Sequence, residues 1–576
     1  MARASTDEKI DDIQVEERIG IVEEGVGAGG ESVHITENSP NHDGGRRSTI
    51  ELAMDRRAAL ADVDNAEFSW FHAKVCVVAG VGFCTDAYDI FAINIASTML
   101  GYVYGTNGEL TANQDFGIKV ATPVGTLVGQ LFFGWVADLV GRKRMYGAEL
   151  MIMVVATFGQ ALAGQGDAVS IIGALVVWRF IVSAGIGGDY PLSAIISSEF
   201  AATRIRGRMV TAVFASQGWG NFLAGLVAFI ATVAFKDSIL ASPTNSPMIH
   251  VESVDAVWRL FVGIGCIPAV AALYFRLTIP ETPRFTMDIE KNIQQARADI
   301  KVALTGKRSD SFDKNAAVVR LQAPEATWSD FLRYFSQWKN GKVLFGTSWS
   351  WFSLDIAFYG LNLNTTIIIQ AIGFNVKAVP TSPLDIYENL RNICIGNMIL
   401  AAAGLIPGYW MCFLFIDSWG RKPIQLMGFI VLTILFVILG FAYDKLTQDS
   451  TKVFVFLTCL ANFFSNFGPN TTTFVIPGEV FPTRYRSTCH GISAASGKLG
   501  AIVAQVTFAQ LRATNGGNKF IKHIFEIFAL FMVTGVFSTL LLPATENETL
   551  EVLSGENQDT FIGGTSRPQH NHTVQA

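Results

Sequence analysis

Residues 185–199 read GIGGDYPLSAIISSE, and they continue an apolar run that begins near Ala168. This stretch places Asp189 and Tyr190 deep inside a predicted membrane-spanning helix, directly before Pro191. A carboxylate in hydrocarbon is energetically costly, and such residues usually mark functional sites. The glycines allow neighbouring helices to approach closely, and the proline interrupts the backbone hydrogen-bond ladder. The stretch therefore predicts a membrane helix that is locally broken, binds a ligand and moves.

The composition of the whole chain is that of a membrane protein. Of its 576 residues, 50% are hydrophobic and 16% are charged, against about 25% charged residues in soluble proteins. The apolar residues gather into runs of about 20, the length that crosses a bilayer as a helix. The sequence therefore predicts an all-α membrane protein with twelve transmembrane helices. The predicted spans are 73–101, 117–138, 144–164, 169–191, 209–235, 257–278, 342–372, 392–416, 423–442, 452–477, 490–511 and 524–543.

The basic loops set the predicted orientation. Arg142-Lys143-Arg144 follow the second run and Arg421-Lys422 follow the eighth, whereas the loops after the first and third runs carry no Lys or Arg. Basic loops face the cytoplasm, so an even number of spans places both termini there as well. The predicted parts are a disordered acidic N-terminal tail (1–70), an N-terminal six-helix bundle (71–279), a cytoplasmic central loop with surface helices (280–340), a C-terminal six-helix bundle (341–544) and a cytoplasmic C-terminal tail (545–576).

The two halves of the chain repeat three short motifs in the same order. GWVADLVGRKR (134–144) matches FIDSWGRKP (415–423), and SEFAATRIRGR (198–208) matches GEVFPTRYRS (478–487). PETPR (280–284) matches PATENETLE (543–551). An Asp at the end of one helix can pair with the Arg of its motif and with a neighbouring helix N-terminus. We expect these repeated loop motifs to act in gating, through Asp138, Arg142, Asp417, Arg421, Glu199 and Glu479.

Across about residues 70–555 the chain resembles the major facilitator superfamily. GIGGDYPLSAIISSE, WFSLDIAFYG (351–360) and FSNFGPNTTTFVIPGEVFPTRYR (464–486) further resemble the phosphate:proton symporters of fungi and plants. The resemblance implies two six-helix bundles with pseudo-two-fold symmetry and alternating access around one central site. It also implies a plasma-membrane location and transport driven by the proton gradient without a cofactor.

A first group of intramembrane charges is predicted to handle protons: Asp86, Asp89, Arg179, Glu149 and Asp189, the last of which is also expected at the substrate. Asp86 and Asp89 lie in CTDAYDIF and share one helix face. They belong either to a water-facing helix section or to a proton relay, and the resemblance favours the relay. Arg179 needs a carboxylate partner in the membrane, and the candidates are Asp86, Asp89 and Glu149. That pair is either structural or a coupling switch.

A second group is predicted to bind the substrate. Asp189 and Tyr190 belong to it, as do two amides, Gln217 and Asn470, which suit an oxyanion without adding charge. Gln217 has the alternative role of a helix–helix hydrogen bond. Asn470 follows Gly468-Pro469, where the helix is predicted to break and to expose N–H groups that attract anions.

Three more residues of this group are spaced by four. Trp351, Asp355 and Tyr359 therefore share one face of the seventh predicted span. An aromatic stripe alone is usually packing, but the Asp in its middle favours a binding face. Lys498, an isolated cation in an apolar run, is expected to balance Asp355 or the ligand.

The expected substrate is inorganic phosphate, with protons and the lipid bilayer as the other partners. Dihydrogen phosphate can donate its hydroxyls to Asp189 and Asp355, whereas sulfate has no hydroxyl to donate. The alternatives are a transporter of an organic phosphate or a sugar, and a receptor that signals without much transport. An enzyme is not expected, because the chain shows no nucleophile–base set, Walker loop or metal-ligand spacing. The net charge of -6 gives no indication of nucleic-acid binding.

Overall fold

The computed structural model describes residues 49–105, 108–241, 252–305, 326–365, 369, 376, 380, 382–515 and 521–556. These residues belong to one compact unit, 47–576. Apart from an isolated bridge between Gly166 and Val169, the regular structure of the described ranges is helical. The ends of the predicted tails, 1–48 and 557–576, lie outside the described residues.

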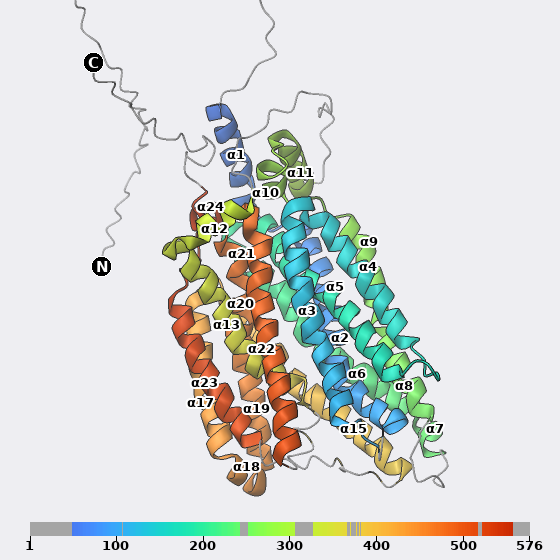
Figure 1. Ribbon diagram of the computed structural model, residues 1–576. Helices are drawn as coiled ribbons and strands as arrows, with labels where there is room; N and C mark the ends of the chain where they lie inside the picture. The colour runs from blue at the N-terminus through green and yellow to red at the C-terminus, as the bar shows by residue number, and fades with distance from the viewer. Residues whose placement is uncertain are drawn as a thin grey trace, which may run out of the picture. The chain divides into compact units, whose positions relative to one another are not determined.

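The long helices fall into two halves of the chain (Figure 1). The N-terminal half contains α2 (Trp70–Tyr104), α3 (Ala112–Val140), α4 (Arg142–Ala161), α5 (Ile171–Phe200), α6 (Arg206–Ala234), α8 (Glu252–Ile264) and α9 (Cys266–Leu277). The C-terminal half contains α13 (Trp338–Asn362), α15 (Pro383–Leu400), the π-turn η2 (Ala401–Leu405), α16 (Ile406–Phe415), α17 (Arg421–Phe441), α19 (Thr451–Asn466), α20 (Pro469–Val475), α22 (Arg486–Asn515) and α23 (Ile521–Leu540). Short helices cap the two ends: α1 (Thr49–Asp64), α7 (Lys236–Leu240), α10 (Pro283–Asp288), α11 (Ile293–Thr305), α12 (Trp328–Ser336), α18 (Tyr443–Asp449), α21 (Pro477–Val480) and α24 (Leu550–Ser554).

Nine helical segments of the described chain are long and apolar enough to cross a membrane. They coincide with nine of the twelve predicted spans. The other three predicted spans contain helices within their described residues, but each is interrupted or polar. α4 begins with Arg142-Lys143-Arg144, α13 begins near Lys339 and Lys342, and the tenth span divides into α19 and α20.

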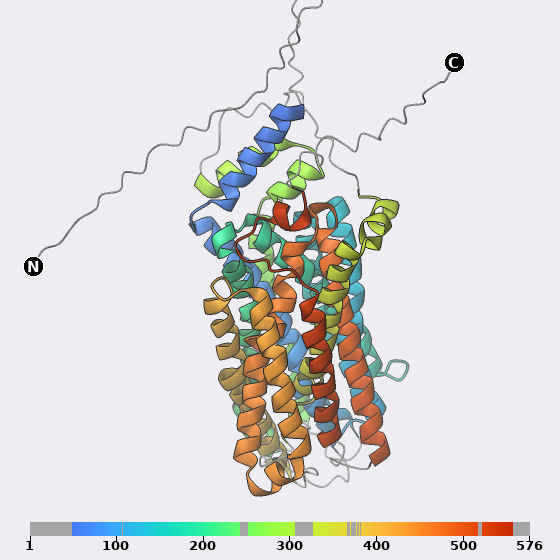
Figure 2. The same ribbon diagram turned by 90° about the vertical axis from the view of Figure 1, so that its left-hand side faces the viewer.

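The largest contacts between the two halves join α3 to α22, and α6 to α15 and α16. Glycine makes the α3–α22 approach possible, because a Cβ added at Gly491 would lie 2.3 Å from the Gln130 carbonyl oxygen. A Cβ added at Gly134 would likewise lie 2.8 Å from the Ser487 carbonyl oxygen. We call this contact region between the halves the seam. Figure 2, turned by 90°, shows the helices of both halves running in roughly the same direction.

One end of the bundle carries the Arg-rich loops, with Arg142, Arg206, Arg421 and Arg486, and we call it the basic end. There the repeated aspartates cap helices of the other half. Asp138 accepts hydrogen bonds from the Thr488 N–H at 2.7 Å and the Ser487 N–H at 3.3 Å. Asp417 accepts them from Gly207 at 3.0 Å and Arg208 at 2.9 Å.

The same aspartates also pair with the arginines of their own motifs. The Asp138–Arg142 distance is 3.1 Å and the Asp417–Arg421 distance is 3.0 Å. The sequence-based expectation that each Asp pairs with its Arg and with a helix N-terminus is confirmed.

The glutamates of the repeat are less symmetric than their sequences. Glu199 accepts a hydrogen bond from Arg486 of the other half at 2.9 Å. Glu479 instead pairs within its own half, with Arg421 at 2.8 Å. Arg206, the sequence counterpart of Arg486, donates to the Glu548 carbonyl and lies 3.6 Å from Asp64.

Residues 49–64 depart from the predicted disordered tail, because they form helix α1. Three apolar side chains of α1, Ala59, Leu60 and Val63, pack with residues of α10 and α11. Arg56 adds a buried ion pair to Asp288 at 2.7 Å. Burial of this apolar face gives α1 the tertiary support that a short helix rich in charged residues needs.

Helix α24, in the predicted C-terminal tail, is also docked at the basic end. Arg284 pairs with Glu551 at 2.7 Å, and it also reaches Asp64 and the Glu199 carbonyl. This arginine lowers the pKa of Glu551 to about 2. Arg284 therefore ties α24 to α1 and to the end of α5.

Candidate functional site

A buried polar cluster lies at the seam, where both halves contribute side chains. α5 and α6 supply residues from the N-terminal half, and α13, α16, α20 and α22 supply them from the C-terminal half. We call it the central cluster. Its members, each exposed by 4% or less, are Tyr190, Gln217, Trp351, Asp355, Tyr359, Tyr409, Asn470 and Lys498.

A chain of hydrogen bonds crosses the seam within this cluster. Gln217 Nε2 donates to the Tyr190 hydroxyl at 2.7 Å, and the Tyr409 hydroxyl donates to Gln217 Oε1 at 3.1 Å. Asn470 Nδ2 donates to the Tyr409 hydroxyl at 2.8 Å. Two amides and two hydroxyls from four helices are thereby held in place, which pre-organises donors without adding net charge.

The charged part of the cluster is one ion pair under two aromatic rings. Lys498 Nζ lies 2.7 Å from Asp355 Oδ2, one of the two partners expected for it from the sequence. The same ammonium lies 4.2 Å from the centre of the Tyr359 ring and 5.1 Å from that of Tyr190. Trp351 packs beside Tyr190, with ring centres 6.3 Å apart. An incoming oxyanion would find a cation, hydroxyls and amides, together with a carboxylate that accepts hydrogen bonds.

The predicted helix break is present, and it lies directly before Asn470 of the central cluster. α19 ends at Asn466 and α20 begins at Pro469, so Asn470 stands in the first turn of a new helix. Pro469 is held against α17, because a Cβ added at Gly428 would lie 2.4 Å from its ring. The first N–H groups of a helix lack partners inside the helix and favour negative charge.

A second buried group, which we call the acid cluster, lies within the N-terminal half. It comprises Asp86, Glu149, Asp189 and Arg276. Arg276 Nη2 lies 2.5 Å from Asp189, and Nη1 bonds to Glu149. Asp86 lies beside Asp189, and among the described residues neither of its oxygens has a hydrogen-bond donor. Three carboxylates against one guanidinium leave an excess of two acids, which protons can neutralise.

Asp189 and Tyr190 are thus divided between the two clusters. Tyr190 faces the residues of the other half, as expected, whereas Asp189 turns to Arg276 and accepts a bond from Ser193. Successive residues of a helix point about 100° apart, which separates the two side chains. No contact of Asp189 with Trp351 or Asp355 is found in the described part of the chain, contrary to the expectation that both residues face them.

Asp89 and Arg179 lie together, but not as the predicted carboxylate pair. Arg179 donates to the main-chain carbonyl of Asp89 at 3.2 Å and to the Thr122 hydroxyl at 2.7 Å. The Asp89 carboxylate accepts a bond from Thr157 at 3.2 Å. Within the described ranges no ion pair joins Arg179 to Asp86, Asp89 or Glu149. The carbonyl and the hydroxyl solvate this buried cation in place of a salt bridge.

Two members of these clusters were missed in the sequence. Arg276 lies near the end of its span, where long cations commonly reach the membrane surface, and so it was not singled out. The rule applied to Arg179, that an intramembrane cation needs a carboxylate, would have found it. Tyr409 stands in IPGYWMCF, where the neighbouring aromatic residues resemble interfacial packing.

Comparison with known proteins agrees with this architecture. Residues 75–555 match the family model described as sugar (and other) transporter. The chain is 48% identical over 517 residues to the repressible high-affinity phosphate permease of Neurospora crassa, covering 87% of this chain and 89% of the relative. It is 45% identical over 519 residues to the inorganic phosphate transporter PHO84 of Saccharomyces cerevisiae, covering 87% of each.

A solved structure shares the fold at low identity. The major facilitator superfamily proton:xylose symporter XylE, bound to 6-bromo-6-deoxy-D-glucose, aligns with a TM-score of 0.64 at 19% identity. The alignment covers 85% of this chain and 100% of that one. The family model and the relatives named permease and transporter show that the chain is a multi-pass membrane transporter, not an enzyme. The chain belongs to the sugar (and other) transporter family, and it shares the fold of the major facilitator superfamily symporter XylE.

Proposed function

We propose that this protein imports dihydrogen phosphate together with protons by alternating access. The observation that carries the proposal is the adjacency of Asp189 and Tyr190 on α5. One residue belongs to the acid cluster, which binds protons, and the next belongs to the central cluster, which binds the anion. A change of charge in the acid cluster therefore acts on α5 next to the residue that holds the substrate.

The chemistry of the central cluster supports phosphate. Lys498, the hydroxyls and the amides can donate to the oxyanion, and Asp355 can accept a hydroxyl proton of dihydrogen phosphate in a hydrogen bond. Sulfate has no such proton and would leave Asp355 facing a like charge. The names of the fungal relatives, a phosphate permease and a phosphate transporter, support the same substrate.

The acid cluster supports proton coupling on energetic grounds. A monoanion that enters a cell against a negative potential climbs about 2.3 kcal/mol per 100 mV. Each proton that enters with it offsets that amount and adds about 1.4 kcal/mol per pH unit of gradient. One proton per phosphate allows accumulation under a pH gradient, a second lets the membrane potential add to it, and the acid cluster has an excess of two acids to carry them.

The charge distribution supports an orientation with both termini in the cytoplasm, and the plasma membrane is the location that the family resemblance implies. The basic end, with its Arg-rich loops and with α1 and α24, would face the cytoplasm under the positive-inside rule. The opposite end, with α7 and α18, would face outward. A reagent that cannot cross the membrane should therefore label a cysteine placed in α18 but not one placed in α1.

Uptake of radiolabelled phosphate into vesicles containing the purified protein tests the proposal. We expect accumulation with an imposed inward proton gradient and only equilibration without one. Arsenate should compete and sulfate should not, and equal competition by sulfate would contradict the role of Asp355. Tyr190→Phe removes one hydroxyl from the central cluster and should raise KM about tenfold, for a lost bond to an anion of about 1.5 kcal/mol.

Tyr274→Phe is the matched control for that variant. Tyr274 is 70% exposed on α9, so the loss of its hydroxyl should leave KM unchanged. Wild-type protein that equilibrates phosphate but never accumulates it under a gradient would exclude the coupling, and protein that moves no phosphate would exclude the substrate.

A further inference from the structure

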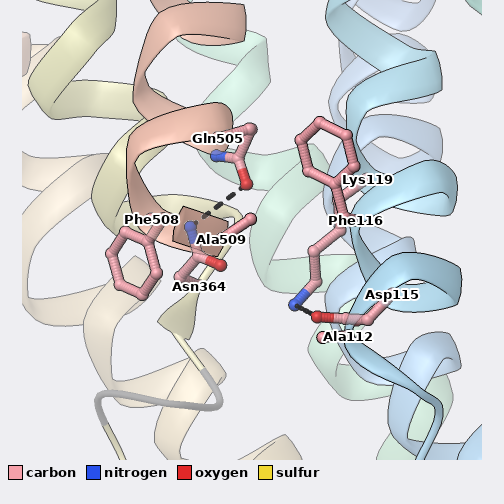
Figure 3. A pocket seen from close by; sticks show the side chains of 8 residues that line it. All are labelled: Ala112, Asp115, Phe116, Lys119, Asn364, Gln505, Phe508 and Ala509. Carbon is pink, nitrogen blue, oxygen red and sulfur yellow. Dashed lines mark hydrogen bonds and ion pairs between the residues drawn. The ribbon is translucent and has the colours of Figure 1, made fainter. Parts of the chain in front are cut away.

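A second polar pocket lies at the seam, away from the basic end. α3 supplies one wall, and the end of α13 and the second half of α22 supply the other (Figure 3). Lys119, Asp115 and Phe116 stand on α3, opposite Asn364, Gln505 and Phe508. We call this the outer pocket. None of these residues belongs to the central cluster or to the acid cluster.

The outer pocket holds a buried cation that fold stability alone does not explain. Lys119 is 4% exposed and lies 2.9 Å from Asp115, one helical turn earlier. Such an i,i+4 pair contributes only about 0.2–0.5 kcal/mol to a helix. A lysine inside a membrane span costs more than that, and such residues usually line a path for ions or substrate.

The outer pocket repeats the chemistry of the central cluster. Each site contains one Lys–Asp pair, which is Lys119–Asp115 in the outer pocket and Lys498–Asp355 in the central cluster. In each site side-chain amides from other helices lie near the pair. In the outer pocket these amides are Asn364 and Gln505, 3.3 Å apart and each 3% exposed. The same ligand class therefore fits both sites: an oxyanion with one negative charge and at least one hydroxyl.

The two sites are connected through α13. Gln505 Nε2 donates to the Tyr359 carbonyl at 3.1 Å, and Asn364 Nδ2 donates to the Gly360 carbonyl at 3.0 Å. The amides of the outer pocket are thus anchored to the main chain at Tyr359, a member of the central cluster. A ligand released from the outer pocket toward the centre would pass along this face of α13.

We propose that the outer pocket is a capture site, in which Lys119, Asn364 and Gln505 bind a hydroxyl-bearing oxyanion before it moves to the central cluster. The inference rests on the proposed function, because it assigns an outer station to the same phosphate. Asp115 selects an anion that carries a hydroxyl, because its carboxylate accepts a hydrogen bond from that hydroxyl. Without a ligand, Asp115 pairs with Lys119.

Kinetics of phosphate uptake under a fixed proton gradient test the capture site. Lys119→Gln should raise KM about tenfold, at the low end of electrostatic steering effects, with Vmax within about twofold. KM of the wild type should rise with ionic strength, and this dependence should flatten in the variant. Lys119→Arg keeps the charge and should restore most of the affinity.

Lys522→Gln is the matched control. Lys522 also lies away from the basic end and pairs with an acid, Asp444 at 3.3 Å, but it stands on α23 outside the seam. Its loss should leave both KM and Vmax unchanged. An equal rise of KM in the two variants would indicate a general surface-charge effect and would overturn the capture site.

Asp115→Asn provides a second, independent variant in case Lys119→Gln fails to fold. It keeps the cation but removes the acceptor, so sulfate should compete at a concentration about tenfold lower, as expected when a like-charge repulsion of about 1.4 kcal/mol is removed. Unchanged KM in Lys119→Gln and unchanged sulfate competition in Asp115→Asn, in a wild type that accumulates phosphate, would refute the capture site alone. A wild type that moves no phosphate would refute the proposed function and the capture site together.

Discussion

At the residue scale, Gly82 shows how little space surrounds the acid cluster. A Cβ added at this position would lie 1.8 Å from Arg276 Nη2 and 2.8 Å from Asp189 Oδ2. The guanidinium therefore lies directly on the main chain of α2, one turn before Asp86. A side chain at Gly82 would push Arg276 away from the carboxylates that it neutralises, and a displaced guanidinium leaves buried acids uncompensated.

We predict that Gly82→Ala uncouples phosphate movement from the proton gradient. Displacement of Arg276 should cost about 1–3 kcal/mol of stability, the usual range for overpacking. With an imposed pH gradient, the variant should only equilibrate phosphate and not accumulate it. Exchange of labelled for unlabelled phosphate should continue. Gly173→Ala on α5 is the control, since its Cβ would meet only Ser170 at 3.9 Å. Normal accumulation by Gly82→Ala would contradict the role given to Arg276.

Residue spacing predicted three members of the central cluster, and intramembrane polarity together with the family resemblance predicted four more: Tyr190, Gln217, Asn470 and Lys498. Trp351, Asp355 and Tyr359 share a face because of helical periodicity, and Lys498 pairs with Asp355 because an intramembrane charge needs a partner. The partner of Asp189 could not be predicted in this way. Helical periodicity orients a side chain only relative to its own helix, and Arg276 reaches Asp189 from α9 through tertiary packing.

At the element scale, the basic end is built from helices that have little stability alone. α24 has five residues and α1 has sixteen. Isolated helices of this length are marginal in water, so they depend on docking. This dependence explains why the sequence indicated disorder before α2: its charge and polarity were visible, whereas the surface of α10 and α11 that covers Leu60 was not.

We predict that Glu551→Gln releases α24 at pH 7. Removal of one partner from a buried ion pair costs at least about 3 kcal/mol. We take this lower value because Arg284 still pairs with Asp64 in the variant. The Leu553 amide, which bonds to the Thr549 carbonyl, should then exchange with solvent about 100-fold faster. Glu548→Gln, at an exposed position, should leave the exchange rate unchanged.

The pH dependence of this contact follows from the lowered pKa of Glu551. A carboxyl whose pKa falls from 4.5 to about 2 on folding contributes its full stability above pH 4.5, and loses it as the pH falls toward 2. Docking of α24 should therefore be constant between pH 5 and pH 7.5. Release of α24 within that range would contradict the Arg284–Glu551 pair.

At the scale of the whole molecule, the basic end is closed by two equivalent caps. Asp138 of the N-terminal half holds the start of α22, and Asp417 of the C-terminal half holds the start of α6. Each cap must break when the halves separate at this end. The pseudo-two-fold symmetry thus appears in the contacts themselves. Each Asp caps a helix of the other half, and the two capped helices, α22 and α6, correspond to each other in the repeat.

We predict that Asp138→Ala and Asp417→Ala each shift the protein toward a form that is open at the basic end. Loss of a helix cap costs about 0.5–2 kcal/mol, and the two effects should add because the sites are independent. A Ser198→Cys reporter, buried at the seam in the wild type, measures the shift by its alkylation rate in a chain whose 7 native cysteines are replaced by alanine. Asp237→Ala, exposed on α7, is the control and should not change that rate.

The adjacency of Asp189 and Tyr190 has a thermodynamic consequence for the whole transport cycle. If a proton on the acid cluster changes phosphate affinity by some factor, bound phosphate must change proton affinity by the same factor, because the two binding equilibria form a closed cycle. The slope of log phosphate affinity against pH is then the negative of the number of protons taken up with each phosphate. One equilibrium titration therefore reports how many protons the site exchanges per substrate, without any measurement of flux.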